Sequence, residues 1–138
     1  LEDRLGRDAA RVRILPRVSS ERFLYLLKAA DVLLDVPQWS GGKTSLEGLA
    51  LGTPIVHRPG AYMRGRPTLA FCRRMGLTAT VVETAAEYAE TAIKLVHDKA
   101  FRSEIREQIA ATSGRLFGDL EAVRETERVW LDALGSAQ

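Results

Sequence analysis

The chain has 138 residues, 46% of them hydrophobic, and a formal net charge of +2, as expected for one soluble domain or a part of one. So small a net charge gives no case for binding nucleic acid, and no apolar run is long enough to span a membrane. A single cysteine excludes an internal disulfide, and two histidines with one cysteine do not make a metal site. We therefore expect a reduced, cytoplasmic setting with neither a nucleic-acid nor a membrane partner.

The first half of the chain alternates predicted strands with predicted helices. Leu1–Asp8 has the pattern of the tail of a helix. The run at 32–36 is apolar on both faces, which is typical of a parallel strand covered by helices. This alternation predicts an α/β fold with a Rossmann-like, mostly parallel sheet and flanking helices. The predicted strands are 11–15, 32–36, 54–59 and 78–82, and the predicted helices are 19–31, 45–51 and 66–76.

From Ala85 onward the pattern is helical, which predicts a helical C-terminal tail. Apolar residues recur at every third or fourth position in three successive segments, although Glu127 interrupts the pattern in the third. We therefore divide the chain into strand–helix units at 1–84 and C-terminal helices at 85–138. The apolar positions are Tyr88, Ala92 and Val96, then Phe101, Ile105 and Ile109, then Leu120, Val123, Trp130 and Leu134.

The glycine-rich segment SGGKTSLEG, residues 40–48, follows the predicted strand at 32–36. Parallel sheets bind ligands at the carboxyl ends of their strands, so the segment lies where a ligand is expected. Its Gly-Lys-Thr tripeptide matches the end of a phosphate-binding P-loop, but the first glycine of that motif falls on Pro37. Proline has a fixed φ and no N–H, so it cannot replace that glycine. We therefore do not expect a P-loop nucleotide hydrolase.

The segment nevertheless has the features of an anion site. Gly41 and Gly42 let the backbone approach a ligand closely, because they carry no Cβ. The N–H groups of Lys43, Thr44 and Ser45 then begin a helix, whose free N–H groups and dipole attract a diphosphate. A plain tight turn into a helix explains the two glycines equally well, so the glycines alone leave both interpretations open.

Side chains around this segment also have two interpretations each. Glu47 stands three residues after Thr44, which fits a capping box, but an acidic residue here can also accept hydrogen bonds from ribose hydroxyls. Spacing alone favours the cap. Arg64 and Arg66 lie in a loop at the same edge and can meet phosphate, although solvated arginines are commoner. His57 ends a predicted strand there, which is weak evidence for a site.

The segment ADVLLDVPQWSGGKTSLEGLALGTPIVHRPG, residues 30–60, resembles the C-terminal catalytic half of O-GlcNAc transferase and its SPINDLY-like relatives. The shared pattern is an aspartate-ended strand, a glycine turn, hydroxyls, an acidic residue and then G-T-P-[IV]-V. The flanking segments follow in the same order, so the resemblance extends over nearly the whole chain. It implies a glycosyltransferase of the GT-B fold, whose C-terminal half binds the UDP of a nucleotide sugar without a metal.

The resemblance also implies roles for individual residues. Glu47 would hold the ribose, which replaces the cap-only interpretation. Phe23 would lie at the uracil, where the family often has a histidine, and Lys43 departs from the family's common histidine or threonine. From the loop and the resemblance together, the expected donor-binding residues are Pro16, Arg17, Val18, Phe23, Gly41, Gly42, Lys43, Thr44, Ser45, Glu47 and Arg64.

We therefore expect the donor-binding part of a UDP-sugar-dependent transferase that moves N-acetylglucosamine or a related sugar to protein Ser or Thr. The family's acid–base group, its acceptor groove and its tetratricopeptide repeats belong to segments not seen here. The chain is thus expected to be an inactive, sticky fragment of one C-terminal nucleotide-sugar-binding domain, with unknown catalytic residues. The alternatives are a GT-B enzyme acting on glycan or lipid, a UDP-sugar epimerase and a non-catalytic interaction domain.

Overall fold

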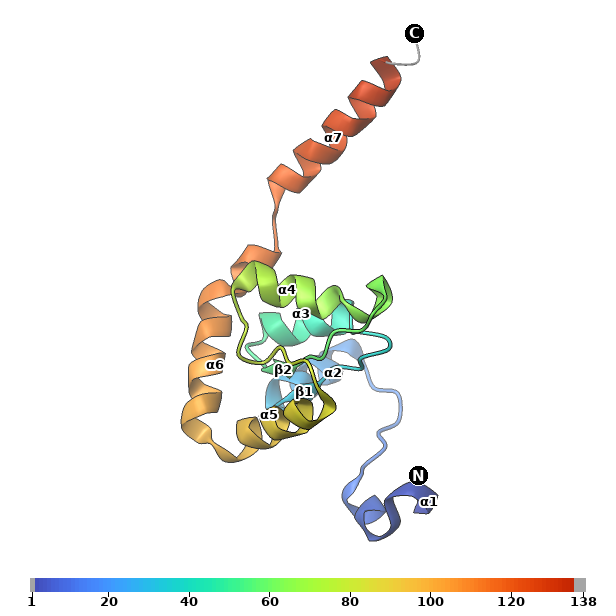
Figure 1. Ribbon diagram of the computed structural model, residues 1–138, viewed down its shortest axis with the longest axis vertical. Coiled ribbons are helices and arrows are strands. Elements are labelled where there is room, and N and C mark those ends of the chain that lie inside the picture. Colours follow the sequence, from blue (N-terminus) through green and yellow to red (C-terminus); the bar gives the residue numbers. More distant parts are fainter. Residues whose placement is uncertain (1, 136–138) are drawn as a thin grey trace.

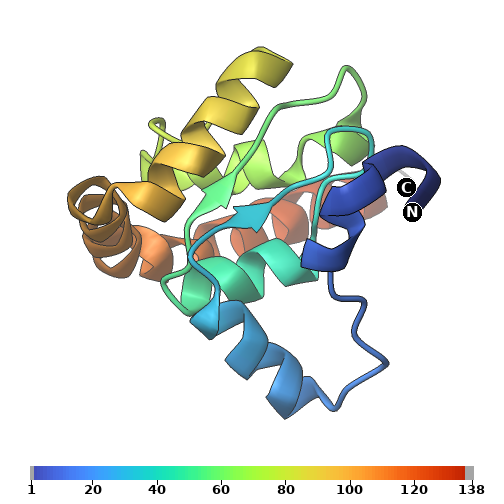
Figure 2. The same ribbon diagram turned by 90° about the horizontal axis from the view of Figure 1, so that it is seen from below.

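Helices surround a small parallel sheet in the computed structural model, which describes residues 2–135 and, among side chains, those of residues 4–135 (Figures 1 and 2). Short 3-10 helices, labelled η, connect several of the longer elements. In chain order the elements are α1 (Glu2–Leu5), η1 (Gly6–Arg11), α2 (Ser20–Ala29), β1 (Leu33–Leu34), α3 (Lys43–Ala50), β2 (Ile55–Val56), η2 (Met63–Gly65), α4 (Pro67–Met75), α5 (Ala85–His97), α6 (Lys99–Thr112), η3 (Ser113–Leu116) and α7 (Leu120–Gly135).

The sheet confirms the prediction of parallel strands, although each strand is short. Strand β1 pairs with β2 in parallel, and beyond β2 an isolated parallel bridge joins His57 to Val81, within the predicted strand at 78–82. Helices α3 and α5 both contact β2 and lie on opposite sides of the strands (Figure 2). The architecture is therefore α/β with flanking helices. The paired residues are Leu33 with Ile55 and Leu34 with Val56.

The predicted strand at 11–15 does not form. Residues up to Arg11 are in η1, and the chain from 12 to 19 has no regular structure, with Ile14 81% exposed. A strand is stable only when a neighbouring strand receives its backbone hydrogen bonds, and no described segment pairs with this one. The helical pattern expected at 1–8 is present in α1 and η1, while Leu1 itself lies outside the described residues.

Local signals explain where the helices begin and end. The Ser19 hydroxyl accepts the N–H of Arg22 at 3.3 Å and caps α2. Helix α4 ends at Gly76, whose φ of 73° is the left-handed conformation that favours glycine. Helix α5 begins with a complete capping box between Thr84 and Glu87. The positions of these helices are therefore encoded locally.

The hydrophobic core lies between the sheet and helices α3 to α6. It includes Ile105 and Ile109, so the predicted apolar face of α6 is confirmed. Burial, and the negative charge of nearby Asp35, raise the pKa of Cys72 to about 12, so this thiol remains protonated and packs as an apolar group. The buried core residues are Leu49, Ile55, Val56, Cys72, Met75, Leu77, Val82, Leu95, Ile105 and Ile109.

Helix α7 projects away from this body (Figure 1). None of its described residues is buried, and Trp130 is 67% exposed. The connector before it contains Gly118, with a φ of 68°, and Asp119, whose carboxylate contacts Arg74 of α4. The other apolar positions predicted for this helix, Leu120, Val123 and Leu134, are exposed as well. Of the helices that the structure describes, none has the length and apolar character to cross a membrane.

Candidate functional site

The glycine-rich segment connects β1 to α3 at the carboxyl edge of the sheet. Gly42 is the N-cap of α3, and the first helical hydrogen bond runs from the N–H of Leu46 to the carbonyl of Gly42 at 3.1 Å. The N–H groups of Lys43, Thr44 and Ser45 precede that bond and have no acceptor within the helix. No side chain caps this end of α3. The segment therefore leaves a free helix N-terminus at the edge where a ligand is expected.

Asp35, the residue after β1, anchors this turn from within the protein. Its carboxylate accepts the N–H of Gly41 at 2.7 Å and the hydroxyl of Ser40 at 2.7 Å, and it lies 2.6 Å from Nδ1 of His57. Burial alone would raise the pKa of Asp35, but hydrogen bonds from His57, Gly41 and Ser40 outweigh it and hold the pKa below the ordinary value of 3.8. Asp35 is thus an ionised buried group whose hydrogen bonds fix the start of the turn.

Thr68, in the first turn of α4, holds the same turn from the other side. Its N–H donates to the Ser40 hydroxyl at 3.1 Å, and its hydroxyl oxygen lies 2.8 Å from those of both Ser40 and Ser45. The hydroxyl also donates to the carbonyl of Gly41 at 3.3 Å. A Cβ at Gly41 would lie only 2.5 Å from the Ser45 hydroxyl oxygen. The buried hydroxyls therefore occupy the space that a side chain at Gly41 would need.

The capping interpretation of Glu47 is wrong. Thr44 lies inside α3 rather than at its N-cap, so the proposed Thr44–Glu47 capping box does not form. Glu47 instead pairs with Lys43 one turn earlier, with 3.4 Å between Oε1 and Nζ. The Glu47 side chain is about a quarter exposed and the Lys43 side chain is almost fully exposed. Both charges are therefore accessible to a ligand at the start of α3.

A pocket of about 670 Å³ is lined by the extended segment before α2, by α2 itself and by the first turns of α3. Six of the sequence-predicted site residues line it, although they come from two segments that are 20 residues apart in the sequence. Two of the six carry charges of opposite sign on α3, and the others present an apolar or cationic wall. These six residues are Pro16, Arg17, Val18, Phe23, Lys43 and Glu47.

A second pocket, of about 260 Å³, shares Leu33 with the first and contains Gly41, Thr44 and Ser45. The Ser45 side chain is buried and its hydroxyl contacts Thr68, whereas Thr44 is exposed. Gly42, the remaining predicted residue of the turn, is exposed at the helix end. The two pockets together surround the first turn of α3.

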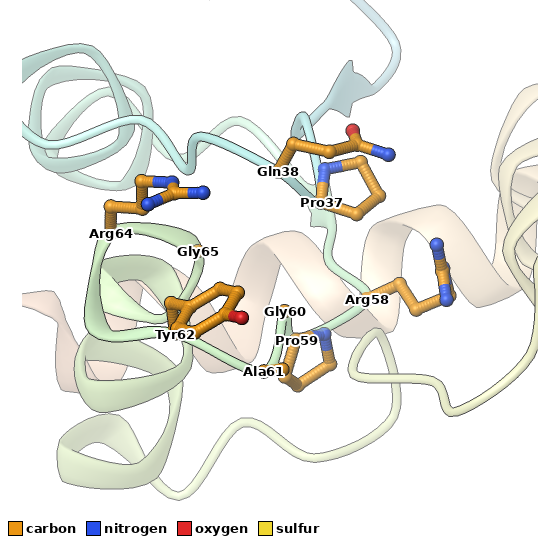
Figure 3. A pocket seen from close by; sticks show the side chains of 9 residues that line it. All are labelled: Pro37, Gln38, Arg58, Pro59, Gly60, Ala61, Tyr62, Arg64 and Gly65. Atoms are coloured by element: carbon orange, nitrogen blue, oxygen red, sulfur yellow. The ribbon is translucent and has the colours of Figure 1, made fainter.

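Arg64 lines a different pocket, of about 290 Å³, at the loop that follows β2 (Figure 3). Its guanidinium carbon lies 4.9 Å from the centre of the Tyr62 ring, and both side chains lie across from Gln38 and Pro37 (Figure 3). Its carbonyl accepts the N–H of Ser40 at 2.9 Å. Arg64 does not line the pocket that contains Lys43 and Glu47. The structure therefore places the two predicted cations, Arg64 and Lys43, in different pockets.

Sequence reasoning missed the polar network behind the turn. A charged residue at the end of an apolar strand needs polar partners if it is buried, so the position of Asp35 in the sequence was an indication of this network. Thr68 carried none, because it lies 28 residues from Ser40 and is adjacent only in the fold. His57 is fully buried and contacts Asp35, so it lies behind the turn. Within the described chain, no three His, Cys, Asp or Glu residues are grouped to hold a metal.

Comparisons with known proteins agree with this architecture. The sequence model of glycosyl transferase family 41 matches residues 3–124. A UDP-N-acetylglucosamine--peptide N-acetylglucosaminyltransferase of Caenorhabditis elegans is 29% identical over 81% of this chain, and a probable SPINDLY enzyme of the same name from Hordeum vulgare is 26% identical over 78%. A solved mutant O-GlcNAc transferase of Thermobaculum terrenum superposes with a TM-score of 0.81 at 31% identity over 94% of this chain.

The chain spans only part of these proteins. It covers 10% of the C. elegans protein, 11% of the H. vulgare protein and 26% of the solved T. terrenum chain. The predicted fold, part of a GT-B glycosyltransferase with a helical C-terminal tail, is confirmed by the solved structure. Because the family match covers most of the sequence, the chain belongs to glycosyl transferase family 41.

Proposed function

We propose that this chain forms the donor-binding part of a glycosyltransferase that uses UDP-N-acetylglucosamine or a related UDP-sugar and glycosylates Ser or Thr of a protein. The donor and the peptide acceptor are taken from the name of the C. elegans relative. Because the chain spans a tenth of that relative, the groups that activate the acceptor are proposed to lie in the rest of the protein. We assign no catalytic base to the described residues.

The observation that supports this function is the pocket lined by both Phe23 and Glu47. An apolar wall at Pro16, Val18 and Phe23 suits a flat nucleobase, and the charged pair on α3 lines the same pocket. The volume of about 670 Å³ is within the range of small-molecule sites. A nucleoside in this pocket would direct its diphosphate toward the free N-terminus of α3.

The chemistry at α3 is stabilisation of a leaving group. Transfer of the sugar forms a bond from its anomeric carbon to the acceptor hydroxyl oxygen, whose proton would pass to a base in the rest of the protein. The bond between the anomeric carbon and the β-phosphate oxygen breaks, and its electron pair remains on UDP. The N–H groups of Lys43, Thr44 and Ser45 and the Lys43 ammonium would receive that charge. The Ser45 hydroxyl already contacts Thr68, so we assign only its N–H to the ligand. In the proposed site these groups would stabilise the leaving diphosphate, a task that a bound divalent cation performs in metal-dependent enzymes.

Glu47 would hold the ribose. In the unliganded site its carboxylate is paired with Lys43, and an exposed pair on one helix contributes only about 0.3–0.5 kcal/mol. A ligand can therefore separate the two charges at little cost. Lys43 would then turn to the diphosphate, while Glu47 accepts hydrogen bonds from the ribose hydroxyls.

The test is titration of the full-length protein with UDP and with inorganic diphosphate. Glu47→Ala is expected to weaken UDP binding by roughly ten- to a hundredfold, because hydrogen bonds to a carboxylate are lost, and to spare diphosphate. Glu90→Ala, an exposed glutamate on α5, is the matched control and should change neither affinity.

Two outcomes would contradict the proposal. An equal loss of both ligands with Glu47→Ala would indicate that the carboxylate supports the helix rather than the ribose. UDP affinity that disappears in excess chelator and returns with magnesium or manganese would show that a metal, and not α3, holds the diphosphate.

A further inference from the structure

Thr68 links three segments that are separate in the sequence. It belongs to α4, yet its hydroxyl lies 2.8 Å from Ser45 in the first turn of α3 and 2.8 Å from Ser40 in the turn before it. Thr68 is completely buried, and Ser40 and Ser45 are nearly so. A ligand at the sheet edge would therefore not touch this hydroxyl.

The same hydroxyl cluster is continuous with the anchor at Asp35. Ser40 donates to the Asp35 carboxylate at 2.7 Å, and that carboxylate also receives the N–H of Gly41 at 2.7 Å. Gly41 is thus held at its N–H by Asp35 and at its carbonyl by Thr68. Buried hydrogen bonds of this kind are costly to leave unmade, so they define one geometry for the turn.

We propose that Thr68 is a positioning residue for the donor site: its hydroxyl fixes the turn at Ser40–Gly41 and the first turn of α3 so that the free N–H groups there converge on a diphosphate. This inference rests on the proposed function and adds a residue that does not itself contact the donor. Misplacing these N–H groups by a fraction of an ångström would weaken binding of the diphosphate and leave the nucleoside pocket intact.

The chain provides a matched control for this hydroxyl. Thr80 is also completely buried, but its hydroxyl has no hydrogen-bond partner among the described residues. Thr80→Val therefore makes the same chemical change at the same degree of burial without removing a hydrogen bond. Thr68→Ser keeps the hydroxyl of Thr68 and removes only a methyl group.

The experiment measures the affinities of UDP and of uridine for the full-length protein by calorimetry. Thr68→Val is expected to weaken UDP binding about tenfold, as loss of hydrogen bonds at a buried hydroxyl would do, and to leave uridine binding unchanged. Thr68→Ser should restore UDP binding, and Thr80→Val should alter neither ligand. Uridine lacks the diphosphate, so it separates a local effect at α3 from general damage to the fold.

Three outcomes overturn the inference. Unchanged UDP affinity in Thr68→Val would show that the hydroxyl does not set the geometry of the helix end. Equal losses for UDP and uridine would show a general structural role. Failure of the wild-type protein to bind UDP would refute the proposed function and, with it, this inference. If Thr68→Val does not fold, Ser40→Ala, which breaks the link between Thr68 and Asp35, decides by the same comparison.

Discussion

The turn around Asp35 and helix α7 differ in whether their side chains contact other parts of the chain. At the turn, buried polar groups from the segment after β1 and from α3 and α4 bond to one another within the chain. In α7, the apolar side chains of Leu120, Trp130 and Leu134 are exposed, and no described residue of the helix is buried. The polar groups of the turn therefore have their hydrogen-bond partners within this chain. Helix α7, in contrast, presents an apolar face that suits an apolar partner. The two regions should respond differently to substitution.

The largest expected difference is between a core leucine and a leucine of α7. In the 138-residue chain, Leu49→Ala should lower the free energy of unfolding by about 2–5 kcal/mol, because it opens a cavity in the core. Leu134→Ala should change it by less than about 0.5 kcal/mol. Urea unfolding followed by circular dichroism measures both. A large cost at Leu134 would mean that α7 folds onto the body in solution.

A smaller effect is expected from acid at Asp35. Its pKa in the folded state lies below the ordinary 3.8, so its stabilisation is present above that value and is lost as pH falls through the folded pKa. Glu87, in the capping box of α5, has its pKa lowered by backbone hydrogen bonds and acts in the same direction. Asp35→Asn should lower the free energy of unfolding by about 2 kcal/mol near neutral pH, because donors to the carboxylate lose a hydrogen-bond acceptor.

The measurement for Asp35 is the unfolding midpoint of the chain between pH 7 and pH 2. The stability of Asp35→Asn should fall less steeply below about pH 4 than that of the wild type. Identical slopes would show that Asp35 is not the group whose protonation loosens the turn.

Substitution of Trp130 is expected to have the smallest effect on stability. It is expected to have a clear effect on association. Trp130→Ser should change the free energy of unfolding by less than about 0.5 kcal/mol, since the ring is exposed. It should lower the average mass of the isolated chain in light scattering, because the apolar face of α7 is reduced. Tyr25→Ser, which removes an equally exposed ring from α2, is the control and should leave the mass unchanged. A monomeric wild-type chain would refute the idea that the exposed apolar face of α7 causes the chain to associate.

The sequence predicted the parts of the fold that depend on local patterns. Helices α2, α4 and α5 begin or end at Ser19, Gly76 and Thr84 because these residues satisfy the helix ends locally. The run at 11–15 has strand-forming residues, but no partner strand among the described residues, so propensity alone gave a wrong prediction. Strand formation depends on a neighbour, and local composition does not supply one.

The candidate site was predictable to a similar degree. The glycine turn and a helix after it followed from residue types, although α3 begins at Lys43, two residues before the predicted bound. The role of Glu47 at the ribose was implied only by the family resemblance, after spacing had favoured a cap. The contact of Thr68 with Ser45 and that of His57 with Asp35 join residues 23 and 22 positions apart. Such contacts arise from the packing of α4 and β2, so no short pattern in the sequence could reveal them.

The connector at Gly118 and Asp119 determines how far the end of α7 moves when the helix rotates relative to the body. One carboxylate oxygen of Asp119 accepts the N–H groups at the start of α7, while the other contacts Arg74 on the body. A helix of 16 residues is about 24 Å long, so a rotation of about 10° at Gly118 would move its far end by about 4 Å. The angle at which α7 leaves the body therefore depends on the conformation at Gly118 and on the contact between Asp119 and Arg74. A small local change there would be amplified at the helix tip.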